Sequence, residues 1–268
     1  MKKILIMAAT IMMAACSQPK PKVLILYYSQ NSNTKTVAEE IQGRLDADIE
    51  EIVSINPYDG NFQETIDRCL KEKQEGILPA IKPLTADLKE YDVVFLGFPV
   101  WFGTYAPPVA TLLTSVDLAG KMVVPFCTFG SGGLDSSVRD LEAAQPDAKI
   151  LPGYGVRTAR LAAVPAEVER WLKENGFISG KYVKYDDFSA VRPASPEEAA
   201  IFDAAVAGYP MLHAAAKNIS SRSVEGGIEY LFEAEDAPNP AFGDEPHMIK
   251  VYVLALEDKA PEFTQVLR

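Results

Sequence analysis

Between residues 22 and 178, short runs of hydrophobic residues alternate with segments in which hydrophobic residues recur at helical spacing. Short apolar runs occupy residues 23–28, 92–98, 121–127 and 148–151, and residues 48–55 alternate in part between apolar and polar side chains. Each segment is followed by apolar residues at helical spacing, over residues 37–45, 61–76, 107–113, 134–142 and 166–175. Strands that alternate with helices build parallel sheets, so the pattern predicts a doubly wound α/β domain over residues 23–178 with a five-stranded parallel sheet.

The pattern changes after residue 178. Ser195, Pro196 and Glu198 have the spacing of a helix start, with a serine cap, a proline in the first turn and a glutamate that completes a capping box. Strand patterns follow over residues 226–235, 247–256 and 263–267, with a turn-rich segment at 236–246. This order predicts a smaller α+β module over residues 179–268, in which residues 181–185 form a further strand or a linker.

Three loops of the predicted α/β domain have an unusual composition. They follow the first, third and fourth strands, at residues 29–34, 99–105 and 128–133. In an open doubly wound sheet, ligands bind at the carboxyl ends of the strands, near the point where the strand order reverses. We therefore expect these three loops to converge on one ligand.

The first loop has the composition of an anion site. It carries hydroxyl and amide groups on Ser29, Asn31, Ser32, Asn33 and Thr34, directly before a helix. The free N–H groups and the positive end of that helix favour a phosphate. Because the loop contains no glycine, it is neither a GxxxxGK[ST] loop nor a GxGxxG fingerprint. The alternative is a strand-to-helix turn whose serine and asparagine side chains only cap the helix.

The second loop is aromatic and the third is rich in glycine. The second loop contains Pro99, Val100, Trp101, Phe102 and Gly103, and a large ring beside a glycine suits stacking on a planar ligand. The third loop offers backbone donors with little side-chain bulk, and comprises Thr128, Phe129, Gly130, Ser131, Gly132 and Gly133. The alternatives are a core tryptophan that covers the sheet edge and a tight turn into the next helix.

Residues 22–176 resemble the flavodoxins, with an insertion after the second strand. Ser29, Asn31, Asn33 and Thr34 stand at matching positions of the flavodoxin phosphate loop, roughly Ser/Thr-x-Thr/Asn-x-Asn/Lys-Thr. The second and third loops match the segments that hold the isoalloxazine ring in such proteins. The resemblance implies FMN as the cofactor, bound by all three loops, and a redox partner protein or a small electron acceptor. FMN would carry the redox chemistry.

No further catalytic residue and no metal site is predicted. The chain has no acid–base pair, Ser-His-Asp set or CxxC motif, and its two histidines, His213 and His247, lie in the C-terminal module. The net charge is −11 and no basic stripe is present, which argues against nucleic acid as a partner.

Residues 1–16 have the features of a targeting segment. Lys2 and Lys3 precede an apolar stretch over residues 4–15 that is too short to span a bilayer, and Cys16 follows two alanines. The segment resembles a bacterial lipoprotein signal, which implies lipidation of Cys16, a tether over residues 17–22, and attachment to a membrane of the bacterial cell envelope on its periplasmic or surface side. The alternatives are a plain signal peptide cleaved near Ala15 and a buried N-terminal helix or strand.

The C-terminal module is similar to the cystatins. The similarity rests on the helix, on residues 221–230 where cystatins have Gln-Val-Val-Ala-Gly-x-Asn-Tyr, and on a later strand with Val251 and Tyr252. Ser221 stands in place of the protease-binding glutamine, so we expect a docking module or a lid on the α/β domain rather than a protease inhibitor.

Two functions fit these features. The first is an FMN-binding electron carrier or small flavin-dependent oxidoreductase of the bacterial cell envelope. The second is a non-catalytic envelope scaffold whose cystatin-like module binds a partner protein. A flavodoxin-type NAD(P)H quinone reductase is a third possibility, although the sequence shows no nicotinamide or quinone pocket.

Overall fold

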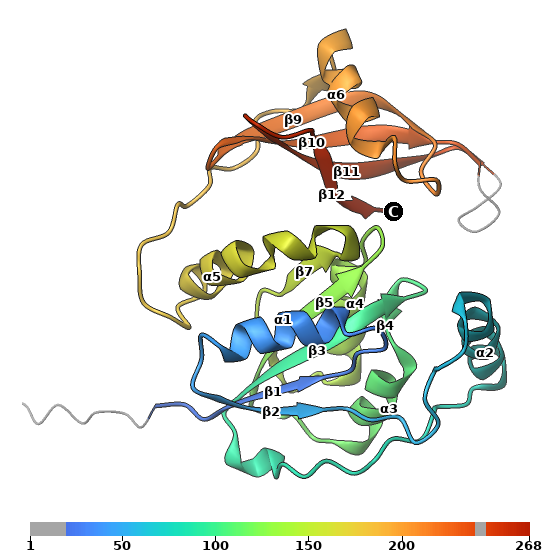
Figure 1. Cartoon of the computed structure of the whole chain (residues 1–268), viewed down its shortest axis with the longest axis vertical. Coiled ribbons are helices and arrows are strands. Elements are labelled where there is room, and N and C mark those ends of the chain that lie inside the picture. Colours follow the sequence, from blue (N-terminus) through green and yellow to red (C-terminus); the bar gives the residue numbers. More distant parts are fainter. Residues whose placement is uncertain (1–19, 239–244) are drawn as a thin grey trace, which may run out of the picture.

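The computed structural model describes residues 20–238 and 245–268 (Figure 1). It contains a largely parallel sheet in the first part of the chain and an antiparallel sheet in the second. We refer to these parts as the parallel-sheet domain and the C-terminal module. The predicted targeting segment and Cys16 lie outside the described residues. Within those residues, no helix has the length and apolar character needed to cross a membrane.

The parallel sheet has the expected doubly wound order. Strands β1 (Val23–Tyr27), β2 (Ala47–Glu51), β3 (Val93–Trp101), β5 (Met122–Phe129) and β6 (Lys149–Ile150) lie in the order β2-β1-β3-β5-β6. All of these neighbours pair in parallel. The strand order therefore reverses between β1 and β3, where such sheets bind their ligands.

The fifth position of the sheet differs from the prediction. The sequence predicts one strand over residues 148–151, but β6 pairs with only the first part of β5, and β7 (Tyr154–Arg157) pairs in parallel with its last part. Pro152 and Gly153 separate the two pieces, because proline cannot donate to a ladder. A further short strand, β4 (Thr104–Tyr105), folds back on the end of β3.

Helices cover both faces of the parallel sheet. Helices α1 (Asn33–Gln42) and α5 (Val164–Glu174) share a core with Ile25 and Phe95. Helices α3 (Pro107–Ser115) and α4 (Leu134–Ala144) share the other core with Leu24 and Leu96. Short 3₁₀ segments, η1 (Leu88–Glu90) and η2 (Thr158–Ala163), complete the domain. Burial on both faces explains why these strands read as continuous apolar runs.

The insertion after β2 forms the separate helix α2 (Phe62–Glu75), at the right of Figure 1. Asn61 and Glu64 close a capping box at its start, and Gly76 ends it in the left-handed conformation with φ of 64°. Of its residues only Cys69 is buried, so the helix packs on the rest of the domain along a narrow stripe.

The C-terminal module is an antiparallel sheet with one helix, as predicted. Its strands β8 (Arg192–Pro193), β9 (Ala214–Val224), β10 (Gly227–Asp236), β11 (His247–Leu256) and β12 (Glu262–Leu267) lie in the order β12-β11-β10-β9-β8. Helix α6 (Pro196–Val206) begins with the predicted capping box of Ser195 and Glu198, and its Phe202 packs on Phe232. Residues 181–185 form no strand, so they belong to the linker between the two parts.

Candidate functional site

The three predicted loops converge at one rim of the parallel-sheet domain. The strands β1, β3 and β5 run in parallel and end on the same side of the sheet (Figure 1). Thr34 in the first loop and Thr128 in the third share a buried hydrogen bond of 2.9 Å between their hydroxyl oxygens. A Cβ atom on Gly133 would lie 2.5 Å from Val100 Cγ1, so the second and third loops also touch.

The first loop presents a row of free backbone donors. Within the described residues, none of the N–H groups of residues 30–34 has an acceptor in the protein. Ser32 turns the backbone into the left-handed region, with φ of 62° and ψ of −2°, directly before α1. Successive N–H groups at such a turn, placed at the N-terminus of a helix, form a concave anion site.

The side chains of the first loop divide into two groups. Asn31 and Ser32 are exposed, and Ser29 and Asn33 are half-buried, so their polar groups lie at the surface beside the free N–H groups. Ser29 Oγ also accepts a hydrogen bond of 3.3 Å from the backbone N–H of Lys35. Thr34 is buried and bonded to Thr128, so its hydroxyl fixes the two loops together and its backbone N–H is the part left for a ligand.

The second loop is the tip of the β3–β4 hairpin. Phe102 and Gly103 both have positive φ, at 51° and 83°, between the paired residues Trp101 and Thr104. This is the backbone of a two-residue hairpin turn, and phenylalanine rarely adopts it. Phe102 is 52% exposed despite its size, so a large apolar ring stands at the rim in a strained conformation.

Trp101 is half-buried and packs edge-on against two tyrosines. Its ring centroid lies 5.9 Å from that of Tyr28 and 5.1 Å from that of Tyr58. The hydroxyl of Thr104, the cross-strand partner of Trp101, is buried without a hydrogen-bond partner among the described residues. Buried polar groups in native proteins are normally satisfied, so this hydroxyl is an unmet polar group inside the hairpin.

The third loop contributes mainly backbone. Thr128 and Phe129 belong to β5 and are buried, so their side chains face the core rather than the rim. Gly130, Ser131, Gly132 and Gly133 lead into α4, and Gly133 has φ of 117° at the helix cap. The part of this loop that lies at the rim therefore consists of glycine and serine residues with little side-chain bulk, as the sequence predicts.

The insertion supplies residues to this region that the sequence pattern does not indicate. Tyr58 is buried against Trp101, and its hydroxyl donates to Glu72 at 2.5 Å. The guanidinium carbon of Arg68 lies 3.7 Å from the centroid of the Tyr58 ring. Burial, followed by the bond to Glu72, raises the pKa of Tyr58, so the phenol stays neutral. Tyr58 lies in a turn sequence, which gives no signal of a role in packing.

Gln30 connects the insertion to the first loop. Its side-chain amide donates to the carbonyl oxygen of Tyr58 at 2.8 Å and to the hydroxyl of Thr65 at 3.1 Å. The first loop, the second loop and the insertion are thus linked by direct contacts, and the insertion helps to set the shape of the rim.

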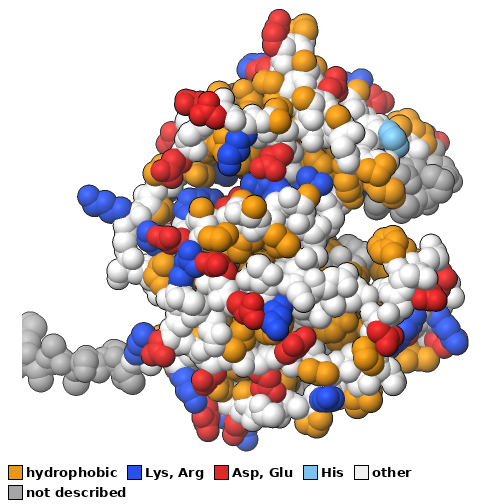
Figure 2. Space-filling model, viewed as in Figure 1, with side chains coloured by type: hydrophobic (Ala, Val, Ile, Leu, Met, Phe, Trp, Pro, Cys, Tyr) orange, Lys and Arg blue, Asp and Glu red, His pale blue; other side chains and the backbone are white. Residues whose placement is uncertain are grey.

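The first loop offers neutral donors rather than strong positive charge. Lys35, the one lysine beside the first loop, pairs with Glu39 at 3.8 Å. Over the face shown in Figure 2, basic and acidic side chains are interspersed across both parts of the molecule. An anion at the first loop would therefore be bound mainly by backbone N–H groups and hydroxyls.

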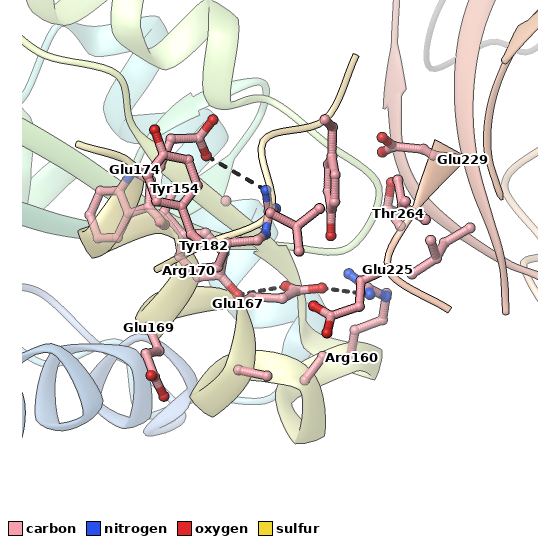
Figure 3. A pocket seen from close by; sticks show the side chains of 18 of the residues that line it. Tyr154, Arg160, Glu167, Glu169, Arg170, Glu174, Tyr182, Glu225, Glu229 and Thr264 are labelled. Carbon is pink, nitrogen blue, oxygen red and sulfur yellow. Dashed lines mark hydrogen bonds and ion pairs between the residues drawn. The ribbon is translucent and has the colours of Figure 1, made fainter. Parts of the chain in front are cut away.

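A separate cavity of about 1000 Å³ lies between α5, the linker and the C-terminal sheet (Figure 3). Its charged walls are largely paired with one another. Arg160 pairs with Glu167 and Glu262, Arg222 pairs with Glu229, and Lys173 pairs with Glu169. None of the predicted loop residues lines it, so it is not part of the candidate site.

Comparison with known proteins places the parallel-sheet domain in a family. Residues 22–175 match the sequence model of a family described as flavodoxin. No curated protein is significantly similar to the chain. The C-terminal module lies outside the family match.

Solved structures resemble the same part of the chain. A provisionally assigned flavoprotein from Bacteroides uniformis ATCC 8492 is 25% identical, with a TM-score of 0.50 over 56% of this chain and 98% of its own. One from Bacteroides eggerthii DSM 20697 is 26% identical, with a TM-score of 0.49 over 58% of this chain and 98% of its own. A flavoprotein from Lactobacillus acidophilus NCFM, in complex with FMN, is 28% identical, with a TM-score of 0.48 over 57% of this chain and 99% of its own.

Proposed function

The chain belongs to the flavodoxin family, and on this premise we propose that it is an FMN-binding protein that carries electrons or acts as a small flavin-dependent oxidoreductase. The bound FMN would supply the redox chemistry. The described protein groups would hold the cofactor, orient its ring and limit the access of water.

The observation that carries this proposal is the row of free N–H groups at residues 30–34. A flavin phosphate is an anion, and the row stands at the N-terminus of α1, where the helix dipole favours negative charge. The side chains of Ser29, Asn31, Ser32 and Asn33 lie beside the same N–H groups and would add polar contacts.

The other two loops suit the ring. The β3–β4 hairpin brings the aromatic side chains of Trp101 and Phe102 to the rim, and the glycines of the third loop allow close approach of backbone donors. Phosphate donors, apolar rings and backbone donors at one rim match the chemistry of FMN.

The first test is the absorption spectrum of the chain without residues 1–16. After incubation with FMN and removal of free flavin on a desalting column, the protein should retain close to one FMN per chain. A protein that stays colourless would contradict the proposal and favour the non-catalytic scaffold, in which the C-terminal module binds a partner protein.

The second test places a charge in the first loop. Asn33→Asp puts a carboxylate beside the proposed phosphate, and repulsion between unit charges 4 Å apart amounts to about 1–4 kcal/mol between water and a partly buried site. The dissociation constant for FMN should rise by about 5-fold to 1000-fold, because every 1.4 kcal/mol changes it tenfold.

Gln74→Glu is the matched control for this charge. Gln74 is exposed near the far end of α2, so the change adds the same charge away from the first loop. It should leave the dissociation constant within about twofold, since exposed charges are screened over about 8–10 Å. Equal effects of both variants would show that net charge, rather than the first loop, controls binding.

We also propose that the protein is held at a membrane of the bacterial cell envelope by a lipid on Cys16. The support is the apolar segment before this cysteine and the polar, proline-containing tether after it. Cys16→Ser should move the protein from the membrane fraction to the soluble fraction and abolish metabolic labelling with a fatty acid. Labelling that persists would contradict the assignment.

A further inference from the structure

The edge strand β12 of the C-terminal module contacts the third loop directly. The backbone N–H of Val266 donates to the carbonyl oxygen of Ser131 at 2.6 Å. Earlier in the same strand, Glu262 Oε1 lies 3.3 Å from Nε of Arg160, a buried residue of the parallel-sheet domain. Figure 1 shows β12 on the side of the module that faces the parallel-sheet domain. The module is therefore attached at the loop itself as well as through the covalent linker.

Arg157, the last residue of β7, bridges the loop and the module. Its Nε donates to the carbonyl oxygen of Gly130 at 2.9 Å, and its Nη1 donates to that of Phe263 at 3.1 Å. The guanidinium carbon also lies 3.4 Å from the centroid of the Phe263 ring. Burial of this side chain lowers its pKa, but arginine stays charged at any pH at which the protein is folded. The Arg157 guanidinium thus binds both the third loop and the C-terminal module.

Gly132 shows how closely the two parts meet. A Cβ atom at this position would overlap the carbonyl oxygen of Val266. Gly132 is not among the residues with positive φ, so its backbone suits any residue and only the approach of β12 requires glycine. Gly130 provides a contrast, because a Cβ atom there would lie 3.6 Å from the hydroxyl of Tyr209, an ordinary contact.

We propose that docking of the C-terminal module and binding of FMN are thermodynamically coupled through residues 130–133, with Arg157 as the positioning residue. The inference rests on the proposed function. The docked module holds the third loop in one backbone arrangement, so that the loop need not be ordered when the flavin binds. Coupling of this kind is reciprocal, so bound FMN must tighten the junction by the same factor by which the junction tightens FMN.

Hydrogen exchange on the chain without residues 1–16 tests the reciprocal effect. Saturating FMN should slow amide exchange in a peptide covering β12, although β12 contributes no residue to the proposed flavin site. In the protein without FMN, Arg157→Met should speed exchange at residues 128–134. Unchanged exchange in both comparisons would overturn the proposal.

Affinity for FMN gives the second readout. Arg157→Met should raise the dissociation constant about tenfold, a coupling of ordinary size for two linked sites, and Arg157→Lys should recover part of the loss. The control is Arg222→Met, because Arg222 also stacks on an aromatic ring and pairs with Glu229 but lies within the module. It should change the constant less than twofold, and equal losses in Arg157→Met and Arg222→Met would overturn the proposal.

Two outcomes separate this proposal from the proposed function. If the unmodified chain retains no FMN, the proposed function fails. If it retains FMN and Arg157→Met binds FMN equally well, only the coupling fails. Because Arg157→Met could unfold the junction outright, Gly132→Ala and Gly130→Ala provide a second pair. Only Gly132→Ala should speed exchange in β12, and equal exchange in both variants would contradict the geometry on which the coupling depends.

Discussion

Removing the hydrogen bond between Thr34 and Thr128 tests, in the protein without a ligand, whether the first and third loops converge. Both residues are almost fully buried, at 1% and 2% exposure. Within the described residues, each hydroxyl has the other as its hydrogen-bond partner, at 2.9 Å. Replacing either threonine by valine keeps the shape of the side chain but leaves the remaining hydroxyl buried and unpaired.

The expected magnitudes follow from that burial. A buried polar group left without a partner costs about 1–3 kcal/mol, so each single variant should lose about 2 kcal/mol of unfolding free energy. Replacing both partners by apolar groups of the same shape is nearly neutral, so the double variant should lose about 1 kcal/mol or less. The two single losses sum to about 4 kcal/mol, and the double-variant cycle should therefore show a coupling of about 3 kcal/mol, near the upper end for residues in contact.

Urea unfolding followed by tryptophan fluorescence is the assay. The chain has two tryptophans, Trp101 and Trp171, and both lie in the parallel-sheet domain, so the signal reports on that domain alone. With a urea dependence of about 2 kcal/mol per molar, each single variant should shift the midpoint by about 1 M. If the losses of the single variants simply add in the double variant, the two hydroxyls do not interact and the first and third loops are not joined as described.

Two further predictions concern stability. Gly97→Ala would drive a methyl group into the Phe126 ring and should lower the unfolding free energy by about 1–3 kcal/mol or more. Gly43→Ala is the control, because a methyl group there meets only ordinary contacts and should leave the stability nearly unchanged. The urea midpoints of the two variants provide the comparison. Hydrogen bonds to Glu198, of which the one from Arg192 has the largest effect, lower its pKa from 4.5 to about 2. The charged carboxylate therefore stabilises the module above pH 4.5, and this stabilisation is lost as the pH falls toward 2. Glu198→Gln should flatten the fall in unfolding midpoint between pH 5 and pH 2.5, measured by circular dichroism; an unchanged slope would show that the pair with Arg192 contributes nothing.

The sequence predicts the parallel-sheet domain well because its strands are buried on both faces. Residues 23–28, 92–98 and 121–127 are continuous apolar runs, and the structure confirms β1, β3 and β5 within a few residues of those limits. The start of α6 is predicted correctly because a capping box is a local feature, set by Ser195 and Glu198 alone. Local chemistry and strong periodicity are the signals that a single sequence carries.

Features that depend on long-range contacts are not predictable in this way. Strand β7 is short and follows a proline and a glycine, so its pairing with β5 is visible only once the sheet is formed. Tyr58 and Arg157 act through contacts with segments that are distant in the chain, and neither belongs to a motif. The sequence therefore predicts the three loops but not the insertion and the module that hold them in place.

Burial changes the roles of some predicted residues at the rim. The composition of the first and third loops does not reveal that Thr34 and Thr128 face each other in the interior, or that Phe129 joins the core beneath α4. Side chains along β5 point alternately to the two faces of the sheet, but the sequence does not show which residue faces which side because both faces are apolar. The side chains of these three residues are therefore buried, and their contact with a ligand stays a prediction that concerns their backbone.

Titration with FMN and with riboflavin under the same conditions tests the central claim most directly. The two molecules share the isoalloxazine ring and differ in the phosphate, which is the group assigned to the free N–H groups of residues 30–34. FMN should bind at least about 100-fold more tightly than riboflavin, because charge-assisted hydrogen bonds to the phosphate are worth about 1.5–3 kcal/mol each and several are available. Equal affinities for the two flavins, or no binding of either, would contradict the assignment of the first loop as a phosphate site.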